Sequence, residues 1–355
     1  MDAHHPRRPR PRRAPRCGPA PRFRCAHPPH ILAGIRRRRI ILTVLISLLL
    51  LAVGLVILIL GADALVRSAA TLARRLGVSQ FVVGVTVVAF GTSAPELFAS
   101  AGAVLQNKTD IAIGNVVGSN IANILLILGA GAVIAPMALH RRVRLVEIPV
   151  MAAITLGAWV MLLDASLTRV EGAILVAGLC GYVYWVVRSG AIELDEDAKP
   201  TGSPLRDILF LIGGIVGLAL GARALVDGSV GLARIAGVPE GIIGATIIAF
   251  GTSLPELAAT VRAGLARQSD IAVGNIIGSN VFNLLCVLGI CTLLRPLQMP
   301  DAMAIHLHAM GGVTVLFMFF ALVRHMIGRI AGVIFLTGYL VYVGYLLYAI
   351  LVETP

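Results

Sequence analysis

Long apolar runs alternate with short polar breaks along the chain, and this pattern predicts helices that cross a membrane. The run Ile40–Gly61 holds no charged residue and is about as long as a bilayer requires, roughly 20 residues at 1.5 Å of rise each. The pattern predicts an all-α polytopic membrane protein with ten spans. Their expected ranges are 40–66, 78–105, 111–136, 146–163, 171–187, 208–226, 238–265, 271–294, 305–323 and 328–351.

Residues 60–129 and 220–289 are two copies of one unit. Sliding the chain by 160 residues aligns them without a gap, and 36 of the 70 positions are identical, including the motifs GTSxPE and GNxxGSN. Five spans, an odd number, separate equivalent points, so the second copy must enter the membrane from the opposite side. The sequence therefore predicts two inverted five-helix repeats, an arrangement typical of secondary transporters.

Composition divides the chain further. Hydrophobic residues make up 57% and charged residues 14%, and 12 of the 30 basic residues lie in the first 39 positions among prolines and histidines. The net charge of +12 is therefore a property of a tail expected to be disordered, and it does not indicate nucleic-acid binding. We expect four parts, which are the tail 1–39, a first repeat half 40–187, an acidic linker 188–206 and a second repeat half 207–355.

The basic residues give conflicting orientations. If the tail is cytoplasmic, the loops on its side hold five Lys or Arg residues and the loops on the other side hold thirteen. We hypothesise that the tail is not native sequence but an upstream reading of a GC-rich gene whose true start lies near Ile40. Both termini would then lie outside the cell. Intact-mass measurement of the natively expressed protein tests this hypothesis.

Each copy carries one acidic residue deep in a predicted span, Glu96 in the first and Glu256 in the second. An ionised carboxylate at that depth costs at least about 2.5–3.5 kcal/mol unless a partner compensates it. A structural ion pair is the alternative, but the acid recurs in both copies, which favours function. Pro95 and Pro255 precede these acids, and each removes a helical hydrogen bond and frees carbonyl groups near Thr92 and Thr252.

The next helix of each copy is expected to form a second wall. Asn115, Ser119 and Asn123 recur at every fourth position and so share one helix face, and Asn275, Ser279 and Asn283 repeat this pattern. Asn115 and Asn275 could equally bond helices together, and the sequence leaves both readings open. Gly114, Gly118, Gly274 and Gly278 should allow close helix approach. Asp110 and Asp270 are expected to cap helices.

These side chains supply two carboxylates, hydroxyls, amide oxygens and carbonyls, without histidine or thiolate. Such oxygen ligands select Ca²⁺, Na⁺ or Mg²⁺. Two negative charges balance one Ca²⁺ or two Na⁺, so competition between these occupancies provides a route to coupled exchange. Cys17 and Cys25 lie near tail histidines with spacing that matches no zinc finger, and no disulfide framework is implied.

The doubled motif resembles the alpha repeats of the sodium/calcium exchangers in the cation/calcium antiporter superfamily, prokaryotic type. The resemblance implies Na⁺/Ca²⁺ antiport by alternating access near the bilayer midplane, with spans one and six rocking or sliding against the rest. It implies Ca²⁺ ligation by Glu96 and Glu256 and the carbonyls of Thr92 and Thr252. The other implied ligands, for Na⁺ and for completing the centre, are Ser93, Ser119, Ser253, Ser279, Asn123, Asn283 and the Ala89 and Ala249 carbonyls.

One position departs from the family pattern, because such exchangers often carry Asp where this chain has Asn283. Potassium dependence, proton coupling and stoichiometry therefore stay open, and a K⁺-dependent or H⁺-coupled cation exchanger is the alternative. The linker is too short for the regulatory domain of eukaryotic members. An intramembrane hydrolase using Ser93 or Ser253 would need a general base, and neither copy contains histidine, so no enzyme activity is expected. A passive channel is a further alternative.

The expected partners are Ca²⁺, Na⁺ and the lipid bilayer, without a cofactor, nucleic acid or obligatory protein partner. We expect a multi-pass protein of the cell membrane, specifically a bacterial inner membrane.

Overall fold

A computed structural model describes residues 29–190, 203–238, 243, 247 and 249–353. The chain divides into two compact units, 1–42 and 43–355. The first contributes residues 29–42 of helix α1, and the description below concerns the second. Predictions about the tail and most of the linker fall on residues outside the described ranges and stay predictions.

The described elements are helical apart from four two-residue strands. In the labels, η marks π-helical turns, except η7, which is a 3₁₀ turn. The first half contains α1 (Pro29–Leu76), α2 (Gln80–Val83), η1 (Gly84–Val88), α3 (Ala89–Thr92), α4 (Ala94–Leu105), α5 (Thr109–Ala122), η2 (Asn123–Leu128), α6 (Gly129–Ile134), β1 (Met137–Ala138), η3 (Val143–Glu147), α7 (Ile148–Met161), β2 (Ser166–Leu167) and α8 (Arg169–Ser189). The second half contains α9 (Pro204–Ile235), α11 (Ala249–Thr252), α12 (Leu254–Leu265), α13 (Ser269–Phe282), η6 (Asn283–Leu288), α14 (Gly289–Leu294), β3 (Leu297–Gln298), η7 (Asp301–Met303), α15 (Ala304–Val323), β4 (Met326–Ile327) and α16 (Arg329–Glu353).

Eight described helices are long and apolar enough to cross a membrane. A ninth span results if Gln80–Thr92 and Ala94–Leu105, which are bent by 43° at their junction, count as one. The predicted span 238–265 includes residues outside the described ranges, so this structure does not test the full count of ten. The expectation of a helical, multi-pass membrane protein is confirmed.

Two helices extend further than their apolar runs predict. The first predicted span stops at residue 66 and the sixth at 226, whereas α1 reaches Leu76 and α9 reaches Ile235. Charged and small residues continue a helix well, so the end of hydrophobicity is not the end of the helix. Both helices stop before a glycine with positive φ, Gly77 at 66° and Gly237 at 78°.

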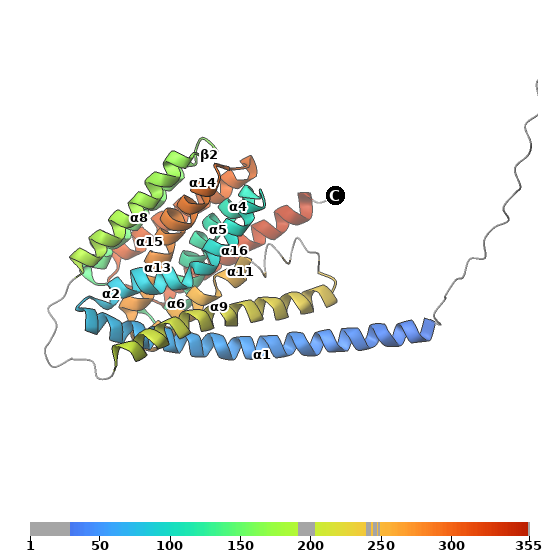
Figure 1. The fold of residues 1–355 in the computed structure, drawn as a ribbon. Coiled ribbons are helices and arrows are strands. Elements are labelled where there is room, and N and C mark those ends of the chain that lie inside the picture. The colour runs from blue at the N-terminus through green and yellow to red at the C-terminus, as the bar shows by residue number, and fades with distance from the viewer. Residues whose placement is uncertain (1–28, 191–202, 239–242, 244–246, 248, 354–355) are drawn as a thin grey trace, which may run out of the picture. The chain divides into compact units, whose positions relative to one another are not determined.

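Helices α1 and α9 run side by side along one flank of the second unit (Figure 1). Their backbones touch at glycines, because a Cβ atom built on Gly214 would lie 2.6 Å from the backbone nitrogen of Leu65. A Cβ on Gly221 would lie equally close to the nitrogen of Leu58. Small residues that allow such approach are typical of helix pairs in membranes, so α1 and α9 form one close pair.

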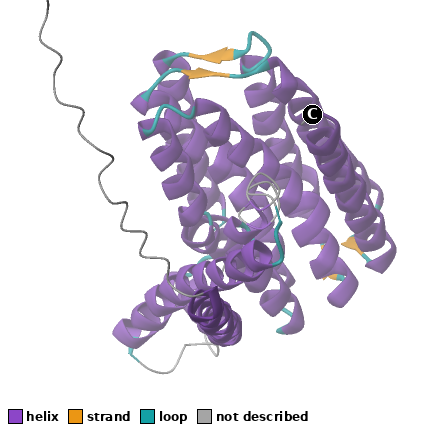
Figure 2. Cartoon of the chain, turned by 90° about the vertical axis from the view of Figure 1, so that its right-hand side faces the viewer, coloured by secondary structure: helices purple, strands orange, loops and turns teal. Residues whose placement is uncertain are grey.

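The four strands form two antiparallel pairs, β1 with β4 and β2 with β3. The sequence repeat relates β1 to β3 and β2 to β4, since each strand lies 160 residues from its counterpart. Each pair therefore joins one strand from each half of the chain, and the 160-residue offset of the repeat converts one pair into the other. Figure 2 shows the two pairs at opposite ends of the helices.

The centre of the second unit is built from the two helical spans that carry the repeated GNxxGSN motif. In the span Ser269–Leu294, 89% of the most hydrophobic stretch is buried, and in Thr109–Ile134 the share is 72%. The other candidate spans bury between 11% and 39%, as expected of helices that face lipid. The inner position of α5 and α13 places their polar side chains away from lipid, in the interior of the protein.

Candidate ion-binding site

Both copies break a helix immediately before the buried acid. In the first copy α3 ends at Thr92, Ser93 adopts a non-helical conformation (φ −86°, ψ 2°), and α4 begins at Ala94 with Pro95 in its first turn. Proline has no N–H, so the carbonyl of Gly91 loses its usual partner four residues on. Glu96 thereby lies in the first turn of α4, where the helix dipole favours negative charge.

The second copy repeats this geometry. Ser253 has the same backbone angles, φ −86° and ψ 2°, and α12 begins at Leu254 with Pro255 and Glu256 in its first turn. The predicted helix breaks at both Gly-Thr-Ser-x-Pro-Glu motifs are therefore present. The local sequence causes them, because each break coincides with a proline and a serine that leaves the helical conformation.

Glu96 and Glu256 are both buried, with exposed fractions of 1% and 2%. The hydroxyl of Ser93 donates to Glu256 Oε1 at 3.0 Å, a contact between the two copies. Within the described part of the chain, Oε2 of each glutamate has no hydrogen-bond partner. Among the described residues neither glutamate forms an ion pair with Lys or Arg, so no described basic side chain compensates their charge when they are ionised.

Asn115 links the helix of Glu96 to the neighbouring helix. Its Nδ2 donates to the Glu96 carbonyl oxygen at 3.3 Å and to Ser100 Oγ at 2.9 Å. The structure therefore supports the helix-bonding reading for Asn115. Ser100 was not singled out from the sequence, although a hydroxyl four residues after the acid in both copies was a usable signal.

Asn275 makes the equivalent contacts in the second copy. Its Nδ2 donates to the Glu256 carbonyl oxygen at 3.4 Å and to Thr260 Oγ1 at 3.0 Å. Its Oδ1 also accepts a hydrogen bond from the Thr92 hydroxyl at 3.1 Å. Asn275 thus fixes α12 to α13 and joins the second copy to the broken helix of the first.

The residues predicted to form the second wall are buried polar side chains. Ser119, Asn123, Ser279 and Asn283 are all at most 5% exposed. The π-helical turns η2 and η6 begin at Asn123 and Asn283, and such turns often occur at functional sites. In the described ranges, more than half of the buried side-chain N and O atoms without a hydrogen-bond partner belong to predicted ligand residues. They are Glu96 Oε2, Glu256 Oε2, Ser253 Oγ, Ser279 Oγ, Asn123 Nδ2 and both amide atoms of Asn283.

The backbone ligands implied by the resemblance have different surroundings. The Ala89 carbonyl accepts the Ser93 N–H at 2.9 Å, so in this conformation it is engaged. Thr252 is half-buried at the end of α11. Ala249 begins α11, and its side-chain surroundings lie outside what the structure describes. The carbonyl ligands stay predictions.

The expected capping role of two aspartates needs correction. Asp110 and Asp270 are not helix caps, since Lys108 and Gln268 occupy the cap positions of α5 and α13 and no side-chain capping bond forms. Asp270 lies 3.3 Å from His140 Nε2 instead. Both acids lie in the first helical turn, where a negative side chain interacts favourably with the helix dipole without forming a capping bond.

The predicted glycine contacts are observed in the second copy. A Cβ on Gly274 would lie 2.8 Å from the Phe81 carbonyl oxygen, and Gly278 faces the backbone of Val85. Among described residues the equivalent Gly118 has nothing within 4 Å of such a Cβ, and Gly114 meets only the Met303 side chain. Close helix packing at this stripe is therefore established for α13 against η1.

The fold and its buried polar centre define an internally duplicated, multi-pass helical membrane protein. The chain belongs to the sodium/calcium exchanger family, because the model of the family described as "Sodium/calcium exchanger protein" matches residues 46–188 and 207–348. Members of this family are membrane transporters rather than enzymes.

Individual relatives agree with this membership. The chain is 40% identical over 236 residues to the putative antiporter CaxA of Alkalimonas amylolytica, covering 64% of this chain and 74% of that protein. It is 36% identical over 328 residues to the inner membrane protein YrbG of Escherichia coli (strain K12), covering 87% and 100%. A solved structure of the sodium-calcium exchanger NCX_Mj matches with a TM-score of 0.78 and 31% identity, covering 85% of this chain and 99% of that one.

Proposed function

We propose that this protein is an antiporter that exchanges Na⁺ for Ca²⁺ at one site between Glu96 and Glu256. The observation that carries the proposal is that several buried side-chain oxygens of the proposed ligand residues, from both copies, have no hydrogen-bond partner among the described residues. Leaving a buried polar atom without a partner costs roughly 1–3 kcal/mol of stability, and leaving a charged one costs more. A bound cation removes that cost for several oxygens at once.

The proposed ligands combine charge with neutral oxygens. Two carboxylates balance one Ca²⁺ or two Na⁺, and hard cations prefer such oxygen donors. The proposed set comprises Glu96, Glu256, Ser93, Ser253, Ser119, Ser279, Asn123, Asn283 and the backbone carbonyls of Thr92, Thr252, Ala89 and Ala249. Because Ca²⁺ and Na⁺ would occupy overlapping ligands, binding of one disfavours the other, which couples their movements.

The proposed architecture has ten spans in two inverted repeats of five, with halves 40–187 and 207–355 separated by the linker 188–206. The strand pairs support it, since the repeat converts β1–β4 into β3–β2 at the opposite end of the helices. Inverted repeats allow alternating access, because the two copies can exchange conformations about a fixed midplane site. No cofactor or obligatory partner protein is part of the proposal.

Transport by vesicles tests the proposed coupling. We expect ⁴⁵Ca²⁺ uptake into vesicles containing the purified protein to require an outward Na⁺ gradient, since Na⁺ must leave the shared site for Ca²⁺ to occupy it. Imposed K⁺ and pH gradients in separate arms test the K⁺-dependent and H⁺-coupled alternatives. Uptake indifferent to Na⁺ would reject Na⁺ coupling, and uptake without any counter-ion would indicate a channel.

A further inference from the structure

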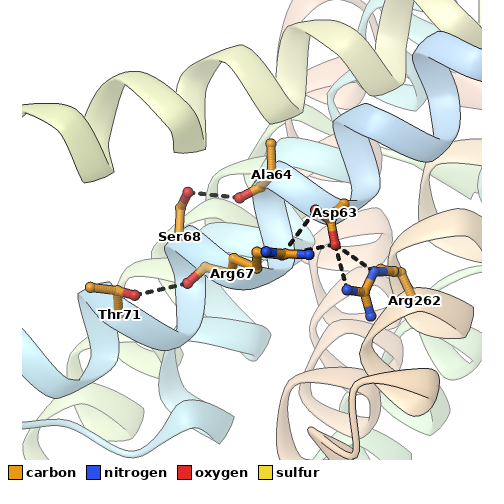
Figure 3. Close-up of polar contacts among 6 residues, drawn as sticks. All are labelled: Asp63, Ala64, Arg67, Ser68, Thr71 and Arg262. Atoms are coloured by element: carbon orange, nitrogen blue, oxygen red, sulfur yellow. Dashed lines mark hydrogen bonds and ion pairs between the residues drawn. The ribbon is translucent and has the colours of Figure 1, made fainter. Parts of the chain in front are cut away.

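An ion pair outside the proposed site joins helix α1 to the helix of Glu256. Arg262 Nε lies 2.7 Å from Asp63 Oδ1, and Arg262 Nη2 contacts the same oxygen. Figure 3 shows Arg262 reaching Asp63 from a different helix. Arg67, on α1 itself, also donates to Asp63 at 3.0 Å. Asp63 thus accepts from two arginines on two helices.

The two contacts differ in exposure. The side chains of Asp63 and Arg262 are 29% and 26% exposed, whereas that of Arg67 is 72% exposed. A solvent-exposed pair within one helix contributes little, while a partly buried pair between helices is screened less. The nearby hydroxyls of Ser68 and Thr71 bond to carbonyls of α1 itself (Figure 3). Among these residues the link to α12 therefore depends on Asp63.

Arg262 is well placed to act on the ion site. It follows Glu256 by six residues in α12, roughly 9 Å along the helix axis at 1.5 Å per residue. The hydrogen bonds of Asn275 to the Glu256 carbonyl and to Thr260 fix the same helix to α13. Asp63 therefore connects α1 to α12, the helix that carries Glu256 and is bonded to α13.

The repeat does not reproduce this pair. The counterparts of Asp63 and Arg262, 160 residues away, are Arg223 and Gly102. In the second copy Arg223 lies 3.8 Å from Asp227 on its own helix, and these side chains are 81% and 58% exposed. If the two copies exchange conformations, an ion pair that joins the copies and has no repeat-related counterpart must stabilise one end state more than the other.

We propose that Asp63 and Arg262 are positioning residues that hold α1 against α12 in the end state seen here. The pair must open before α1 can move past the Glu256 helix, so it sets the balance between the two end states. This inference rests on the proposed alternating-access exchange. The pair needs one residue from each copy, and the repeat-related residues Arg223 and Gly102 cannot form it.

Ca²⁺ affinity on the two membrane faces tests the pair. Apparent affinity on one face depends on the fraction of transporters that face it. We expect Asp63→Asn and Arg262→Gln each to raise the apparent KM for Ca²⁺ on one face and to lower it on the other, by about fivefold. Right-side-out and inside-out vesicles give the two values. A merely structural defect would lower the maximal rate without opposite KM shifts.

Two controls sharpen this test. The double variant Asp63→Asn/Arg262→Gln should shift KM no more than either single variant, because both remove the same contact. Asp227→Asn, which removes the exposed pair of the second copy, should leave both KM values unchanged. Unshifted values in the first variants, additive shifts, or an equal effect of Asp227→Asn would each overturn the ion-pair proposal alone. A wild-type protein without Na⁺-driven Ca²⁺ exchange would overturn both proposals.

Discussion

Replacing Glu256 with glutamine is expected to reduce Na⁺-driven Ca²⁺ uptake by at least about 100-fold, and Glu96→Gln is expected to do the same. Glutamine keeps the size of the side chain and an oxygen that can accept from Ser93, but it removes one of the two charges that would balance Ca²⁺. Leaving a buried charge uncompensated costs about 3–5 kcal/mol, which corresponds to roughly 10²–10⁴-fold. ⁴⁵Ca²⁺ uptake normalised to folded protein measures the effect.

Glu147→Gln provides the matched control. Glu147, the last residue of η3, is also buried, and one of its carboxyl oxygens has no partner among the described residues, but it pairs with Arg142 at 3.2 Å and lies outside the repeated motifs in the sequence. We expect this variant to keep transport, even if thermal stability falls. Equal losses in Glu147→Gln and Glu256→Gln would mean that burial of an acid, rather than its place in the site, determines the effect.

The second large effect is expected from Gly274→Val. A Cβ atom there would lie 2.8 Å from the Phe81 carbonyl oxygen and 3.0 Å from the Val85 nitrogen, so α13 and η1 would have to separate. Overpacking of this kind costs about 1–3 kcal/mol or more. Because η1 continues into the broken helix with Ser93, the shift would displace ligands, and we expect Ca²⁺ uptake to fall more than tenfold.

Gly157→Val on α7 controls for the valine itself, since a Cβ at Gly157 meets nothing within 4 Å among the described residues. It should transport like the wild type. Uptake and melting temperature of both variants, measured on the same preparation, distinguish a displaced site from an unfolded protein. Normal uptake by Gly274→Val would show that the close contact of α13 and η1 is not needed for transport.

Much of the candidate site could be predicted because its chemistry is local. Each motif proline removes a helical hydrogen bond, so interruptions of the helix near Ser93 and Ser253 are expected from the sequence. The period of the helix likewise groups Ser119 with Asn123 on one face. Duplication strengthened both predictions, since each feature occurs twice.

Contacts between the copies could not be predicted in this way. The bonds from Ser93 to Glu256 and from Thr92 to Asn275 span more than 160 residues, and they depend on how the copies dock. The same is true of Asp63 with Arg262. Helix ends were also missed, because α1 continues past its apolar run until Gly77 allows the chain to turn.

Equilibrium ⁴⁵Ca²⁺ binding to the purified protein, titrated with Na⁺, tests the central claim most directly. A single shared site predicts one bound Ca²⁺ per chain, displacement by Na⁺ with a Hill coefficient above one, and loss of binding in the Glu96→Gln/Glu256→Gln double variant. Ca²⁺ binding that is unaffected by saturating Na⁺, or that survives the double substitution, would contradict a shared site between the two glutamates.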